Sequence, residues 1–208
     1  MKDKMLGQLY GLILKNSYIT NYKISFSTTK PLEAEKYLRL MNELLNVKEE
    51  ELIYYLEDIQ YGKSESAIDK FKLFIPKILT HQTYFFHRPN KAKPRLTIIY
   101  YSKALPTMIL SLFKHLHLLQ QNIDFSRGFL DACLSSSVYS NERKELIVKT
   151  SKIIPYLINC LENLGMYYET RNNDVILLNQ HDLKDITGFA DICKGRIHSF
   201  TPTTMINA

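Results

Sequence analysis

The chain has 208 residues, of which 45% are hydrophobic and 23% are charged, the composition of an ordinary soluble globular protein. No apolar run approaches the roughly 18 residues that a membrane helix needs, and no signal-peptide cleavage site follows the charged N-terminus, so we expect an intracellular protein without membrane contact. The net charge of +6 suits a polyanionic partner.

In the first half, an apolar helical stretch around Gly11 leads into a polar turn at Asn16. From Tyr22 to Thr28 apolar and polar residues alternate, which predicts a strand. Its polar side consists of Lys23, Ser25 and Ser27.

Further along, Pro31 is expected to open a helix, because proline is favoured in the first turn. Residues 95–101 predict a strand, and residues 105–119 predict a helix. The segment between, 63–90, has no counterpart in the second half and is interpreted as an insertion. Within it, Pro76 is expected to bend or end any helix.

The second half repeats this order of elements. Residues 126–134 predict a helix around Gly128, residues 145–150 a strand, and Ser151 is a candidate N-cap for a helix that Gly165 ends. A hairpin turned by Asn172 and Asn173 and a short closing helix at 181–189 follow. The predicted boundaries are 1–119 for a first repeat, 120–124 for a linker, 125–190 for a second repeat and 191–208 for an extended tail.

Two stretches carry a resemblance to a known family. They read Leu9-Tyr10-Gly11-Leu12-Ile13-Leu14-Lys15-Asn16-Ser17 and Ser126-Arg127-Gly128-Phe129-Leu130-Asp131-Ala132-Cys133-Leu134. Both resemble the LAGLIDADG motif of homing endonucleases, and the resemblance extends over about residues 5–190. It implies an α+β, pseudo-symmetric fold of two αββαββα repeats. The motif helices would pack at the centre through Gly11 and Gly128, and two antiparallel four-stranded sheets would form a saddle over DNA.

The resemblance also implies which residues would hold the catalytic metal. In the family, an acid five residues after each motif glycine binds the metal, and here those positions hold Asn16 and Cys133. A neutral amide and a soft thiol are poor ligands for magnesium, so we expect an inactive site with no metal and no cofactor. Replacing both residues by aspartate is expected to restore a metal site. Asp131, rotated by about 200° along the helix from Cys133, is interpreted as a surface or capping carboxylate.

The second motif is similar in more detail to the WhiA-type bacterial regulators, which carry a degenerate LAGLIDADG domain. Their pattern Phe-x-Arg-Gly-x-x-x-Ala-Cys-x-Ser matches the segment from Phe125 to Ser135. Leu134 departs from the glycine that is usual there. The three cysteines of the chain, Cys133, Cys160 and Cys193, are interpreted as buried reduced thiols, because an odd, widely spaced set fits neither a disulfide framework nor a zinc ribbon.

Basic residues gather in the strands and in the segment before residue 95, which indicates a surface for phosphates. The candidate nucleic-acid contacts are Lys23, Ser25, Ser27, Arg88, Lys91, Lys93, Arg95, Arg143, Lys144, Lys149 and Arg171.

Four functions remain open at this point. The first is a monomeric, inactive binder of double-stranded DNA with a role in transcription regulation. The second is an RNA-binding maturase or splicing factor, and the third is an endonuclease with substituted metal ligands. The fourth is a module that binds a protein partner.

Overall fold

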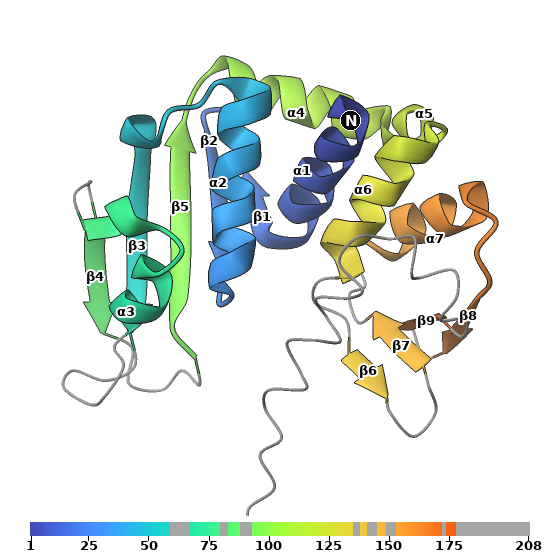
Figure 1. Ribbon diagram of the computed structural model, residues 1–208. Coiled ribbons are helices and arrows are strands. Elements are labelled where there is room, and N and C mark those ends of the chain that lie inside the picture. Colours follow the sequence, from blue (N-terminus) through green and yellow to red (C-terminus); the bar gives the residue numbers. More distant parts are fainter. Residues whose placement is uncertain are drawn as a thin grey trace, which may run out of the picture.

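The computed structural model describes residues 1–58, 67–79, 83–87, 93–134, 138–140, 145–148, 153–171 and 174–177. Over these ranges it forms two α/β halves that meet at a central pair of helices (Figure 1). The predicted α+β, pseudo-symmetric fold is confirmed. The predicted closing helix at 181–189 and the tail at 191–208 lie outside the described residues.

The first half contains the motif helix, a sheet and its covering helices. Its elements are α1 (Lys2–Asn16), β1 (Ser17–Ile19), β2 (Lys23–Thr28), α2 (Pro31–Leu45), the 3-10 helix η1 (Glu49–Glu51), β3 (Leu52–Asp58), α3 (Ala67–Lys72), the 3-10 helix η2 (Pro76–Leu79), β4 (Thr83–His87), β5 (Arg95–Tyr101), α4 (Ala104–Lys114) and α5 (Leu116–Gln120).

The second half repeats the order with shorter elements. They are α6 (Ile123–Leu134), β6 (Val138–Ser140), β7 (Glu145–Val148), α7 (Ile154–Asn163), β8 (Tyr168–Arg171) and β9 (Asp174–Leu177). The N-cap of α7 is Ile153, so the expected cap at Ser151 is wrong; Pro155 occupies the first turn instead.

The predicted insertion adds a fifth strand to the first sheet. The strand order is β1-β2-β5-β3-β4, and β4 pairs with β3 in parallel, whereas the second sheet, β6-β7-β9-β8, is antiparallel. The expectation of four antiparallel strands is therefore wrong for the first sheet. The cause is the crossover through α3 and η2, because a chain that returns to the same end of a sheet adds a parallel neighbour.

The predicted linker at 120–124 is much shorter in the structure. Gln120 is buried at the end of α5, where its carbonyl accepts hydrogen bonds from Ser126 Oγ at 2.6 Å and Asn163 Nδ2 at 2.9 Å. Asn122 then caps α6, since its Oδ1 accepts from the backbone N–H of Phe125 at 3.1 Å. Gln120 therefore anchors α6 and α7 to α5. The helix predicted at 105–119 is also broken, at His115, whose N–H bonds the carbonyl of Leu112 in a tight turn.

Each half has its own apolar core, and α1 contributes to both. Leu9, Leu12 and Ile13 pack into the first core, and Tyr10 packs into the second. In the first core the ring of Phe26 on β2 stacks on the ring of Tyr37 on α2, with centroids 4.1 Å apart. The amphipathic pattern of α2 is therefore explained by its packing on one face of the sheet.

The two motif helices approach so closely that glycine is required on both. A Cβ added to Gly128 would overlap the backbone carbonyl of Lys4, and a Cβ added to Gly7 would overlap that of Phe125. Gly11 also lies in this interface, with an added Cβ only 2.8 Å from Ala132 Cβ and 2.9 Å from Phe129 O. Helix α1 therefore presents two glycines, one turn apart, to α6.

These contacts define the register of the repeat. The overlap of Gly7 with Phe125 and the overlap of Gly128 with Lys4 are the same contact made from each repeat, if equivalent residues are 121 apart in the sequence. The hairpins agree, since Ser17 pairs with Phe26 and Val138 pairs with Ile147. In the structure, the residue of the first repeat that is equivalent to Gly128 is therefore Gly7, and the residue of the second repeat that is equivalent to Gly11 is Ala132. Gly11 and Gly128, the glycines of the two sequence motifs, are 117 residues apart and are therefore not equivalent in the structure.

We predict that Gly128→Ala destabilises the protein by about 3 kcal/mol or more, because a methyl group directed at a backbone carbonyl forces the two helices apart. The measurement is urea denaturation followed by circular dichroism. Gly165→Ala is the control: Gly165 has φ +64° and no neighbour within 4 Å of an added Cβ, so it should cost only about 1 kcal/mol of backbone strain. Equal losses for the two variants would contradict the close packing of α1 and α6.

Candidate nucleic-acid interface

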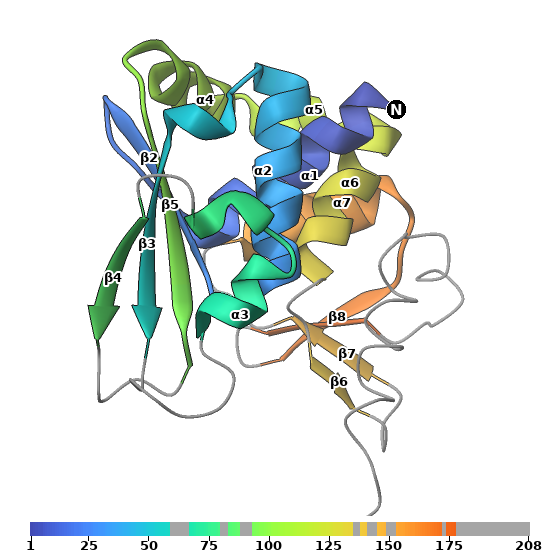
Figure 2. The same cartoon turned by 60° about the vertical axis from the view of Figure 1, so that its left-hand side comes forward.

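Among the described elements, helices cover one face of the first sheet and none covers the other. Figure 2 shows α2 and α3 on the same side of the sheet. On that side Ile24, Phe26 and Ile98 are fully buried, while their neighbours along the strands are partly or fully exposed. We call the uncovered side the open face. Its residues on β1, β2, β3, β4 and β5 are Tyr18, Lys23, Ser25, Ser27, Ile53, Tyr55, Glu57, Tyr84, Phe86, Arg95, Thr97, Ile99 and Tyr101.

The strand register aligns these residues in rows across the open face. Ser27 lies opposite Thr97, which lies opposite Tyr55, and the Ser27 and Thr97 hydroxyl oxygens are 2.8 Å apart. Lys23 lies opposite Tyr101 at one end, and Arg95 lies opposite Glu57 at the other. The open face therefore carries a cation at each end and hydroxyl and aromatic groups between them. Such groups suit contacts to phosphates and to base edges.

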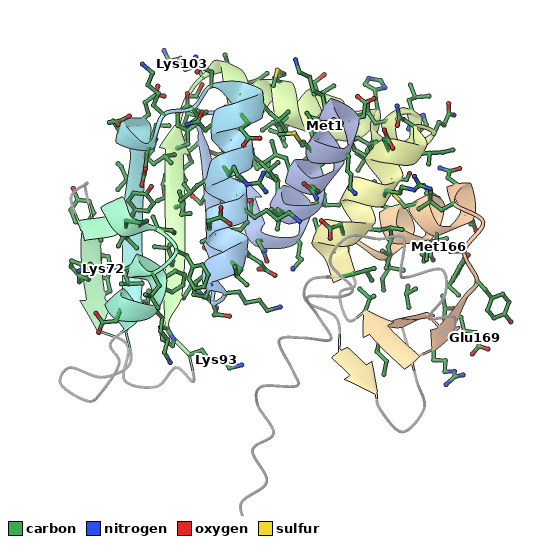
Figure 3. The ribbon with its side chains drawn as sticks, in the orientation of Figure 1. Met1, Lys72, Lys93, Lys103, Met166 and Glu169 are labelled. Atoms are coloured by element: carbon green, nitrogen blue, oxygen red, sulfur yellow. The ribbon has the colours of Figure 1, made fainter. Side chains whose placement is uncertain are left out.

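The structure places four of the predicted contact residues on the open face: Lys23, Ser25, Ser27 and Arg95. Lys93 is exposed just before β5 begins (Figure 3). Five further predicted residues, Arg88, Lys91, Arg143, Lys144 and Lys149, lie outside the described residues.

Arg171 is differently situated from the other predicted contacts. Its Nη2 lies 2.6 Å and its Nε 3.1 Å from Glu169 Oε2 on the same strand, β8. This carboxylate compensates the guanidinium charge at the edge of the second sheet. Figure 3 labels Glu169 there, on the half opposite Lys93.

Sequence reasoning identified Ser25 and Ser27 but did not include four further hydroxyl and aromatic residues of the open face among the contacts. Tyr18, Tyr55, Thr97 and Tyr101 belong to it, and Tyr18 is 68% exposed. Part of the signal was present in the sequence, since polar and apolar residues alternate from Arg95 to Ile98, whereas residues 52–56 are all aliphatic or aromatic and do not show which side of that strand is open.

The two predicted acid positions differ in environment. Asn16 is partly buried at the C-terminal end of α1, where its Nδ2 donates to Glu33 Oε2 at 3.2 Å. Cys133 is fully buried in the second core, and an added Cβ on Gly11 would lie 3.6 Å from its Sγ. Burial raises the pKa of the Cys133 thiol and keeps it neutral. At the structural offset of 121, the residue equivalent to Cys133 is Leu12, which is also fully buried.

Glu33 supplies the carboxylate nearest to Asn16, and it is engaged by other groups. Its side chain is 8% exposed and lies 2.8 Å from Lys15 Nζ, itself 7% exposed. Thr28 Oγ1 donates to Glu33 Oε2 at 2.9 Å, and Lys30 Nζ lies 3.6 Å from Oε1. Burial raises the pKa of the Glu33 carboxyl, but the charge and hydrogen bond of Lys15, with Lys30 and Thr28, outweigh it and hold the pKa below 4.5.

Asp131 is not the surface or capping carboxylate expected from the sequence. It is 4% exposed, and its Oδ2 lies 2.5 Å from Lys36 Nζ on α2 and 2.6 Å from Gln8 Nε2 on α1. The direction away from Cys133 is as expected, but on α6 that direction leads into the interface with α1 and α2. A sequence pattern alone does not show that a third helix covers this side.

Within the described part of the chain, no three histidine, cysteine, aspartate or glutamate residues are grouped so that they could hold a metal ion. In the same ranges, no helix combines the length and the hydropathy that crossing a bilayer requires.

No protein-family model matches the chain, and no curated protein is similar to it in sequence. Solved structures are similar in fold. I-DmoI in complex with DNA and Mn matches with TM-score 0.52 and 14% identity over 89% of this chain and 97% of that one. I-DmoI with DNA and Ca matches with TM-score 0.52 and 14% identity over 93% and 98%.

Two further solved structures are similar to the chain. Mesophilic variants of the homing endonuclease I-DmoI match with TM-score 0.51, and the N-terminal LAGLIDADG domain of DUF199/WhiA matches with TM-score 0.47, each at 14% identity. The chain therefore has the LAGLIDADG fold, as the motifs indicated, and this conclusion rests on the I-DmoI structures.

We predict that Glu33→Gln lowers stability by about 3 kcal/mol at neutral pH, because it removes the carboxylate charge that lies 2.8 Å from the buried Lys15 Nζ. The pKa of Glu33 is depressed in the folded state, so its contribution is complete above its unfolded value of 4.5 and is lost as the pH falls through the folded pKa. The difference between wild type and variant should therefore shrink below pH 4.5. Urea denaturation across this range measures it.

The control for this prediction is Glu35→Gln on the same helix. Glu35 is 41% exposed and lies 3.8 Å from Arg39, so its loss should cost less than about 1 kcal/mol. A Glu33 variant as mild as this one would show that the buried ion pair does not contribute.

We predict that Cys133→Asp lowers stability by about 3 kcal/mol or more, since it places a carboxylate in an apolar core. Combined with Asn16→Asp, it should not create a magnesium site, which reverses the expectation drawn from the sequence alone. Calorimetric titration with magnesium measures binding, and Cys133→Ala controls for the lost thiol. A stable double variant that binds magnesium would contradict the buried placement of Cys133.

Proposed function

We propose that this chain is an intracellular nucleic-acid-binding protein that holds duplex DNA on the open face of its first sheet and does not cleave it. Its role would be regulatory. The observation that carries this proposal is the open face itself, where Lys23 and Arg95 flank hydroxyl and aromatic side chains. Helices α2 and α3 cover the opposite face of the same sheet.

The fold neighbours support the choice of DNA. I-DmoI was solved in complex with DNA together with manganese or calcium, and this chain overlaps nearly the whole of that protein. The open face belongs to the first of the two sheets that the fold provides. The net charge of +6 adds a long-range attraction for phosphates.

The proposed lack of cleavage is supported by the chemistry of the helix ends. Hydrolysis by a hard metal ion requires anionic oxygen ligands that are free to bind it. Asn16 is neutral and Cys133 is buried, and the nearby carboxylates of Glu33 and Asp131 are held by Lys15 and Lys36. A metal ion would have to displace the buried Lys15 and the partly buried Lys36.

We predict that wild-type protein binds a mixed-sequence DNA duplex with an affinity that falls steeply with salt, and that Lys23→Ala and Arg95→Ala each weaken binding. Each substitution removes one cation from the open face, so each should reduce the slope of log affinity against log salt by about one. Fluorescence anisotropy over a range of salt concentrations measures both effects. The same duplex should remain intact in magnesium or manganese.

Lys72→Ala is the matched control, since Lys72 is exposed on α3, on the helix-covered side of the sheet (Figure 3). It should leave the affinity and the slope nearly unchanged. Salt-independent affinity, or a loss with Lys72→Ala equal to that with Lys23→Ala, would refute the assignment of the surface. Stronger binding of structured RNA in direct competition would favour the maturase alternative, and cleavage would favour the endonuclease.

A further inference from the structure

Three aromatic rings form a cluster at the outer edge of the open face. Tyr55 on β3 lies opposite Tyr84 on β4, with ring centroids 5.1 Å apart and planes 19° apart. Phe86, two residues along β4, stacks on the same Tyr55 ring with centroids 5.6 Å apart and planes 21° apart. We call these three residues the aromatic platform.

The two rings that β4 contributes to the aromatic platform are about half exposed to solvent. Tyr84 and Phe86 are each 48% exposed on β4, which is the edge strand of the sheet. Half-exposed stacked rings leave aromatic surface in contact with water, and covering it with another flat ring is favourable. Strand β4 of the inserted segment therefore adds a half-exposed aromatic surface beyond β3.

The surroundings of the aromatic platform indicate the chemistry of its occupant. Tyr55 lies in the same row as Thr97 and Ser27, and Arg95 and Glu57 lie in the next row beside Phe86. The rings thus adjoin hydroxyl groups and a guanidinium rather than a wider apolar patch. A nucleobase with its phosphate matches this combination, because the base stacks while the cation and hydroxyl groups bind the backbone.

We propose that the aromatic platform stacks unpaired bases of a nucleic-acid strand that continues from the duplex on the open face. Because stacking tolerates every base, the platform would add affinity for a single-stranded flank without reading its sequence. This inference rests on the proposed function for the position of the duplex. The platform's preference for an unpaired strand can nevertheless be measured separately.

The test compares a blunt mixed-sequence DNA duplex, the same duplex with a thymidine overhang of about six nucleotides, and the free oligothymidine. The overhang should raise the affinity of wild type about tenfold. The variant Tyr84→Ala/Phe86→Ala should lose this gain, so that it binds the blunt duplex and the duplex with the overhang equally well. Tyr84→Phe/Phe86→Tyr should retain the gain, because both rings remain.

The matched control is Phe85→Ala, which removes a ring of similar exposure, 46%, from the opposite face of the same strand. It should leave the overhang gain intact. Quenching of a 2-aminopurine placed in the overhang reports stacking directly, and urea denaturation verifies that each variant folds.

The outcomes separate this inference from the proposed function. If wild type binds the blunt duplex but gains nothing from the overhang, or if Phe85→Ala loses as much as the platform variant, the inference is wrong and the proposed function stands. If the overhang and free oligothymidine bind through the platform while the blunt duplex does not, the duplex proposal fails alone. If wild type is a dimer that the platform variant converts to a monomer, the rings serve a second copy of the chain and the inference is overturned.

Discussion

The close approach of α1 and α6 is the constraint on which the rest of the structure depends. Backbone carbonyls of Lys4 and Phe125 occupy the space that a side chain on Gly128 or Gly7 would need. Two helices in such contact have little freedom to slide or rotate, so each fixes the position of the hairpin that follows it. The equal pairing of Ser17 with Phe26 and of Val138 with Ile147 is the consequence in the sheets.

Helix α2 secures this central pair of helices through one buried and one partly buried ion pair. Glu33 near its start receives Lys15 of α1, and Lys36 one turn later reaches Asp131 of α6. Buried pairs of this kind are weak evidence for stability, because desolvation offsets most of the attraction. Their geometric effect is clear nonetheless, since an unpaired charge in any other arrangement would be costly. The carboxylates nearest the centre of the fold are thereby occupied in holding helices together.

The sequence predicted the fold class, the order of the elements and the alternation of β2, because these follow from periodicity and from two glycine-containing motifs. It failed on the details that depend on contacts between distant segments. Gly7 was missed because the family motif matches better four residues later, around Gly11, whereas helix packing selects the register. Asp131 was placed at the surface because no local pattern reveals that α2 covers that side of α6. The parallel direction of β4 was missed because it depends on a crossover connection, which is recognised only once the pairing of β4 with β3 is known.

The two halves share an architecture but differ in the side chains that their sheets expose. The first sheet has gained a strand and carries Lys23 and Arg95 beside hydroxyl and aromatic groups, whereas the described cation of the second sheet, Arg171, is bound to Glu169. In a symmetric saddle both halves would contact a duplex to a similar extent. Among the described residues, the cations on an open sheet face, Lys23 and Arg95, lie on the first sheet, and the inserted strand extends that sheet further from the central helices. An interface built on one half does not require the two halves to be symmetric. A two-metal cleavage site between the halves would require it, because both halves would have to supply ligands. Under the proposed function, the residues Asn16 and Cys133 at the motif positions and the fifth strand of the first sheet are compatible, since a protein that only binds would not be required to position two helix ends around one phosphodiester pair.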